Sequence, residues 1–70
     1  MLIGNNLKTA RKKAGLTQVD VAITLNITER QYQRYEADTY EPDLCKLCAL
    51  ADLFGVTTDY LLGRCDGNDA

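Results

Sequence analysis

The sequence predicts an all-α fold of five short helices. In five stretches the apolar residues recur every three or four positions, which is the spacing of a helix face. Thr or Asp precedes most of these stretches, and Gly or Asn follows them, as at helix termini. No stretch shows the alternation of a strand, and 70 residues can bury one modest core. We therefore expect one domain over residues 1–70, with its core at about 5–63 and a frayed tail at 64–70.

The first helix is expected from about Asn5 to Ala14. Leu7 and Ala10, three positions apart, form its inner face, and basic residues cover its outer face. Gly15 follows at the place where a left-handed C-terminal cap is expected.

Thr17 is the expected N-cap of the second helix, and Asp20 three residues later completes a variant of the capping box. Asn26 is expected to end this helix, because Asn is one of the few non-glycine residues that adopt the left-handed conformation. Ile27 then fills the tight turn. The inner stripe of the helix consists of Val21, Ala22 and Leu25.

The third helix is expected to open at Thr28, with Gln31 three residues later as a second capping box. Its inner face carries Tyr32 and Tyr35 together with Glu36. Exposed tyrosines can stack on the bases of a single strand, but the three-residue spacing beside apolar neighbours favours core positions here. The opposite face holds Arg30, Gln33 and Arg34.

Two further helices follow a loop that ends at Pro42. Asp43 is the expected N-cap of the fourth helix and Gly55 its end, and Thr57 then caps a last helix at Thr58–Leu62. The fourth helix is expected to be a core helix because of its broad apolar stripe. This stripe consists of Leu44, Leu47, Leu50, Ala51 and Phe54.

Composition and charge limit the classes of protein to which this chain can belong. No apolar run approaches the roughly 20 residues of a membrane span, and the N-terminus lacks the pattern of a secretion signal, so we expect a cytoplasmic protein with no membrane partner. The net charge is −2, yet residues 1–35 carry +4 and residues 36–70 carry −6. Because Lys and Arg neutralise phosphates, the basic half is the one that can face nucleic acid.

No catalytic residue, metal site or cofactor is predicted. The sequence has no histidine and no glycine-rich phosphate loop, and so small a domain leaves no room for a substrate pocket, so neither an enzyme nor a small-molecule substrate is expected. Cys45 and Cys48 have CxxC spacing, but only Cys65 could join them, whereas structural zinc sites use four ligands. We expect reduced, structural cysteines, with at least one of the helical pair buried as a small hydrophobic residue.

The second and third helices, joined by a turn at Asn26-Ile27, have the spacing of a helix-turn-helix. The residues that carry a resemblance are Leu16-Thr17-Gln18, Ala22, Leu25-Asn26-Ile27-Thr28, Tyr32, Arg34-Tyr35-Glu36, Pro42 and the run from Leu50 to Leu62. On these residues the chain resembles the phage repressor and Cro family, which is lambda-repressor-like or XRE-type, from about Leu7 to Leu62. The resemblance implies a compact five-helix domain that binds double-stranded DNA with the helix at Thr28–Glu36 in the major groove.

The resemblance also implies roles for single residues. Gln18 matches a position that binds a backbone phosphate, and Thr28 caps the recognition helix. Arginine can hold guanine O6 and N7 with two hydrogen bonds, and glutamate can accept from a cytosine amine, which hints at a GC-containing half-site. For Glu29 and Gln33, a solvated position is the alternative to DNA contact. The residues on the DNA-reading face are Glu29, Arg30, Gln33 and Arg34.

Two further features follow from the comparison with this family. Arg11 and Glu36 match an ion pair that ties the first helix to the end of the third.

The loop after the third helix departs from the family, in which Gly is common there and Lys or Arg often reach phosphate. Its acidic residues repel the DNA backbone, so we expect modest affinity unless Tyr40, main-chain amides or a dimer compensate. The loop residues are Asp38, Thr39, Tyr40 and Glu41.

Two functions fit these observations. The first is sequence-specific binding of double-stranded DNA as a transcriptional regulator, with a repressor expected, in which a homodimer places two recognition helices in half-sites one helical turn apart. The alternative is a protein-interaction module on the same fold, antitoxin-like or anti-regulator. The acidic second half of the chain favours this alternative.

Overall fold

The computed structural model describes residues 3–64, which form five α-helices. They are α1 (Gly4–Lys13), α2 (Gln18–Leu25), α3 (Glu29–Glu36), α4 (Leu44–Phe54) and α5 (Thr58–Leu62). The prediction of an all-α five-helix fold is confirmed, and the predicted helix ends agree to about one residue. Apart from Arg64, the expected tail at 64–70 lies outside the described residues. Within residues 3–64, no helix is long and apolar enough to cross a membrane.

Side chains cap the N-termini of α2, α3, α4 and α5. Thr17 Oγ1 accepts from the Asp20 amide at 3.1 Å and the Asp20 carboxylate accepts from the Thr17 amide at 3.0 Å, so the capping box predicted for α2 is confirmed. The hydrogen bond from the Thr17 amide to the carboxylate keeps the pKa of Asp20 below its ordinary value. The N-cap residues are Thr17, Thr28, Asp43 and Thr57.

All five helices of the described range end in the same backbone motif. The amide of a left-handed residue donates to the carbonyl three positions back, and the next amide donates to the carbonyl five positions back. The left-handed residues are Gly15, Asn26, Asp38, Gly55 and Gly63. In three of these turns the next residue is apolar and packs against the core, which fixes the direction of the chain. These residues are Leu16, Ile27 and Val56.

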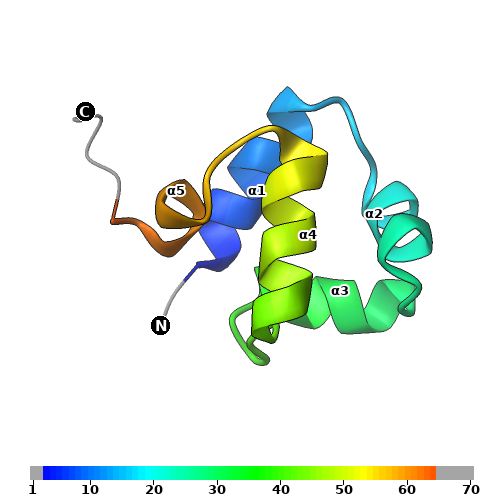
Figure 1. The fold of residues 1–70 in the computed structure, drawn as a ribbon. Helices are drawn as coiled ribbons and strands as arrows, with labels where there is room; N and C mark the ends of the chain where they lie inside the picture. The colour runs from blue at the N-terminus through cyan, green and yellow to red at the C-terminus, as the bar shows by residue number, and fades with distance from the viewer. Residues whose placement is uncertain (1–2, 65–70) are drawn as a thin grey trace.

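The core lies where the inner faces of the helices meet. In Figure 1, α4 stands at the centre with α2 on one side and α1 and α5 on the other, while α3 crosses near its lower end. This arrangement buries one face of α4, and α3 packs against α1 and α2. The most deeply buried side chains are Leu7, Val21, Tyr32, Tyr35, Leu50 and Leu61.

Two predictions about α4 are wrong. Leu44, placed in the apolar stripe, is 80% exposed, and Cys45 and Cys48 are free thiols that are both exposed. The residues that are buried on α4 define a narrower stripe, namely Leu47, Leu50, Ala51 and Phe54. At about 100° per residue, Cys45 lies roughly opposite this stripe, and Leu44 and Cys48 lie beside it. Cys65 lies outside the described residues.

The first turn of α1 is fixed by a residue of the loop after α3. No side chain of α1 caps this helix; instead, Asp38 Oδ1 accepts from the amides of Ile3 at 2.9 Å and Gly4 at 2.8 Å. Gly4 packs so closely that a Cβ atom there would overlap the carbonyl oxygen of Glu36. The start of α1 is therefore held directly against the end of α3.

Candidate nucleic-acid interface

The turn between α2 and α3 spans only Asn26 to Thr28. Asn26 has φ 58° and ψ 43°, and the amide of Ile27 donates to the carbonyl of Ala22 at 3.0 Å. Ala22 is buried, and its small side chain lets the two helices approach each other. Thr28 Oγ1 then accepts from the amide of Gln31 at 3.1 Å and opens α3. This geometry is that of a helix-turn-helix.

The N-cap prediction for α3 is confirmed, but the capping box is not formed as expected. The side chain of Gln31 does not return to Thr28; its Nε2 donates to the hydroxyl of Tyr35 at 3.1 Å. Tyr35 is buried, so Gln31 satisfies a polar group at the edge of the core. Gln31 thus has a structural role on the inner side of α3.

The two faces of α3 differ sharply in exposure. Tyr32 and Tyr35 are buried, with their ring centroids 6.2 Å apart in an edge-to-face arrangement. The prediction that both tyrosines are core residues is confirmed. The outer face exposes four polar side chains in two i, i+4 pairs, which are Glu29 with Gln33 and Arg30 with Arg34. Two buried aromatic side chains therefore support the exposed polar face of α3.

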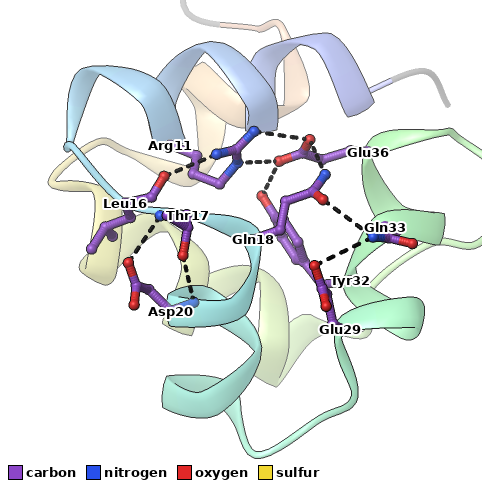
Figure 2. A network of polar contacts seen from close by, with 9 residues as sticks. All are labelled: Arg11, Leu16, Thr17, Gln18, Asp20, Glu29, Tyr32, Gln33 and Glu36. Carbon is purple, nitrogen blue, oxygen red and sulfur yellow. Dashed lines mark hydrogen bonds and ion pairs between the residues drawn. The ribbon is translucent and has the colours of Figure 1, made fainter.

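Behind this surface, a network of polar contacts joins α1, α2 and α3 (Figure 2). Arg11 Nε lies 2.7 Å from Glu36 Oε2, and the Arg11 and Glu36 side chains are only 10% and 6% exposed. Arg11 Nη1 also donates to the carbonyl of Leu16 at 2.9 Å. The hydroxyl of Tyr32 donates to Glu36 Oε2 at 2.6 Å, and Gln18 Nε2 donates to Glu36 Oε1 at 3.0 Å. Glu36 is thus the acceptor on which three helices converge.

The network keeps Glu36 ionised. Burial alone raises the pKa of this carboxyl, but the hydrogen bonds from Arg11, Tyr32 and Gln18 together outweigh burial and hold the pKa below its ordinary value. The hydrogen bond to Glu36 raises the pKa of Arg11. Burial, followed by the hydrogen bond to the carboxylate, raises the pKa of the Tyr32 hydroxyl. At neutral pH the site contains a buried carboxylate, a guanidinium and a neutral phenol.

Gln18 links this buried network to the outer face of α3. Its Oε1 accepts from Gln33 Nε2 at 3.3 Å, and Gln33 Nε2 also lies 3.5 Å from Glu29 Oε2 (Figure 2). Three of the predicted DNA-contacting residues are therefore joined in one chain of hydrogen bonds. Glu36, which was expected only in the ion pair, is the inner end of that chain.

Arg30 and Arg34 stand outside the chain of hydrogen bonds. Both are exposed, and within residues 3–64 neither side chain makes a hydrogen bond or ion pair. Their guanidinium groups are therefore available to a ligand over α3. Among residues 3–64, no group of three or more His, Cys, Asp and Glu side chains gathers as a metal site would require.

Sequence reasoning missed the contacts that cross between distant segments. Asp38 was expected to repel DNA, yet its carboxylate binds the first amides of α1. Nor was the bond from Gln18 to Glu36 expected, because these residues are 18 positions apart. Its only sequence signal was that Gln18 starts a helix next to the one that ends at Glu36.

A comparison with known protein families identifies the family to which the fold and the exposed face of α3 belong. The family model described as "Helix-turn-helix" matches residues 7–61, and the chain belongs to this family. The same range contains the turn at Asn26 and the exposed face of α3.

Among its relatives, the chain is 47% identical over 64 residues to the HTH-type transcriptional regulator ImmR of Bacillus subtilis (strain 168), covering 91% of this chain and 50% of ImmR. It is 41% identical over 61 residues to the SPbeta prophage-derived uncharacterized HTH-type transcriptional regulator YonR of the same organism, covering 87% and 56%. It is 33% identical over 64 residues to the immunity repressor protein of Bacillus phage phi105, covering 91% and 44%. The chain thus spans about half the length of these relatives, and none of their names denotes an enzyme.

Proposed function

We propose that this chain is the DNA-binding part of a transcriptional repressor, which inserts α3 into the major groove of double-stranded DNA. The observation that carries the proposal is the exposed polar face of α3, which is supported from behind by two buried tyrosines. A helix with such a face fits the width of the major groove. The relatives named as transcriptional regulators and as an immunity repressor support the same function.

The proposed contacts divide between the DNA backbone and the bases. Gln18 lies at the start of α2, where a helix N-terminus and a side-chain amide can bind one phosphate. Thr28 starts α3 and orients its first turn toward the groove. The bases are read by the exposed side chains of Glu29, Arg30, Gln33 and Arg34.

We further propose that two copies bind one operator as a homodimer. A single copy offers a short helix and few cations, so two half-sites one helical turn apart would multiply a modest affinity. Sedimentation of the protein with a duplex carrying both half-sites tests this stoichiometry. Two copies per duplex are expected, and a single copy at saturation would contradict the dimer.

Arg30→Ala tests the base-reading role. Fluorescence anisotropy against an operator obtained by unbiased selection should show that the substitution weakens binding by about 1–3 kcal/mol and relaxes specificity at one position. Arg64→Ala is the matched control, because it removes the same charge from an exposed residue beyond α5. If both variants weaken binding equally for all sequences, Arg30 contributes only charge.

A protein-interaction module is the second candidate, and a specific surface favours it. Tyr40 in the acidic loop is 56% exposed, and Leu44 just after the loop is 80% exposed. Apolar side chains beside carboxylates are typical of a contact with a protein partner. Salt-insensitive or absent DNA binding, together with recovery of one stoichiometric protein partner that Leu44→Ser abolishes, would favour this function.

A further inference from the structure

The hydrogen bonds that join Glu36 through Gln18 to Gln33 have a direction that is fixed by chemistry. An ionised carboxylate can only accept hydrogen bonds, and the two oxygens of Glu36 receive four donor groups, two of them from Arg11. Gln18 must therefore turn its amide nitrogen toward Glu36. Its carbonyl oxygen is left on the opposite side, where it accepts from Gln33.

The same reasoning orients Gln33. Its amide nitrogen carries two hydrogens, and two acceptors face it: Gln18 Oε1 at 3.3 Å and Glu29 Oε2 at 3.5 Å. The reverse orientation would place the oxygen of Gln33 against two other oxygens, which repel it, and both acceptors would lose their donor from the protein. The carbonyl oxygen of Gln33 consequently points away from the network, as Figure 2 shows.

We propose that Gln33 is a specificity-determining residue that presents only its carbonyl oxygen to DNA and thereby selects a base with an exocyclic amine. The inference rests on the proposed function, in which α3 lies in the major groove. In that groove, adenine N6 and cytosine N4 are donors, whereas guanine O6 and N7 and thymine O4 are acceptors. Gln33 therefore favours adenine or cytosine over guanine or thymine on the strand that it faces.

The proposal differs from the usual behaviour of glutamine. An unrestrained glutamine binds adenine through both N6 and N7 and so selects adenine over cytosine. Gln33 directs both amide hydrogens at Gln18 and Glu29, so neither of them is directed at adenine N7. It is therefore expected to bind adenine and cytosine with similar affinity. Gln18 acts through Gln33 as a positioning residue, and its second amide hydrogen remains available to a phosphate.

The test measures base preference rather than affinity alone. Anisotropy titrations use the selected operator and duplexes that carry each of the four base pairs at each position. The folded chain should bind adenine or cytosine about tenfold more tightly than guanine or thymine at one position per half-site. Gln33→Ala should remove this preference at that position only, and Gln33→Lys, a pure donor, should reverse it. Both variants change an exposed side chain and should keep the thermal unfolding midpoint.

Gln18→Ala separates positioning from phosphate binding. It should reduce the preference for adenine or cytosine several-fold at the Gln33 position and leave the Arg30 position unchanged. A phosphate contact alone would lower affinity equally for all duplexes, and that result would overturn the positioning role. A preference for adenine over cytosine would overturn the fixed orientation. If no duplex is selected, the proposed function itself fails; a selected operator with no position sensitive to Gln33→Ala refutes this inference alone.

Discussion

Replacing Arg11 with methionine is expected to remove most of the folding stability at pH 7. Methionine keeps the apolar stem of Arg11 but leaves the buried carboxylate of Glu36 without its cation. Each pH unit corresponds to about 1.36 kcal/mol, so holding this carboxyl protonated at pH 7 against an ordinary value of 4.5 costs about 3.4 kcal/mol. Breaking a buried ion pair from one side typically costs about 3–5 kcal/mol, and a domain of this size is rarely more stable than about 5 kcal/mol.

Urea denaturation followed by circular dichroism measures the effect. The double variant Arg11→Met with Glu36→Gln is the matched control, because the neutral amide removes the buried charge and can still accept from Tyr32. The double variant should therefore be more stable than Arg11→Met alone. If the two substitutions instead add as independent losses, or if Arg11→Met costs less than about 1 kcal/mol, the ion pair does not hold α1 to α3.

The sign of the pH dependence gives a second check on the same reasoning. In the unsubstituted chain the pKa of Glu36 is lowered by folding, so its contribution to stability is present above 4.5 and is lost as the pH falls below that value. In Arg11→Met the contribution of the cation is lost, and burial, the largest single influence on this carboxyl, is expected to raise the pKa of Glu36. The variant should consequently gain stability as the pH falls from 7 toward 4.5. Parallel stability profiles for the two proteins over this interval would refute the assignment to Glu36.

Three substitutions test the other contacts that hold the site, each by its shift in the urea midpoint. Gly4→Ala should destabilise by about 1–3 kcal/mol, because the new Cβ meets the backbone of Glu36; Asn5→Ala, on the exposed face of the same turn, is its control. Asp38→Ala should cost about 1–2 kcal/mol through the lost cap of α1 and a strained left-handed residue, and Asp38→Asn should cost less. Thr28→Ala should cost about 1 kcal/mol and also weaken DNA binding, since it frays the first turn of α3. A midpoint shift from Asn5→Ala equal to that from Gly4→Ala would contradict the steric explanation.

The sequence predicted best those features that depend on neighbours three to five positions away. The N-cap residues and the left-handed ends at Gly15 and Asn26 are encoded by single residue types whose backbone preferences are strong. The burial of Tyr32 and Tyr35 followed from helical periodicity, which holds wherever one face is clearly apolar. The helix-turn-helix could be predicted because it consists of such local signals in a fixed order.

Features that depend on the exact rotation of a helix, or on contacts between distant segments, could not be predicted. The apolar character of Leu44 made the stripe of α4 look broader than the surface that the other helices cover, and the three-residue spacing of Cys45 and Cys48 in an apolar helix suggested that one of them is buried. The bond between Gln18 and Glu36 requires two helix ends to meet. The hydrogen-bond partners that orient Gln33 lie in different elements, so the sequence could not say which atom of its amide faces outward.

These contacts show that the acidic loop after α3 has a structural role besides its effect on DNA affinity. Asp38 lies at the N-terminus of α1, where the positive end of the helix dipole compensates part of its charge, so it repels a nearby phosphate less than an isolated carboxylate would. Glu36, two residues earlier, binds Arg11 near the other end of α1. One short segment at the end of α3 therefore holds α1 at both ends. Replacing these carboxylates with cations would add charge facing DNA, but it would also release the helix that fixes the position of α3.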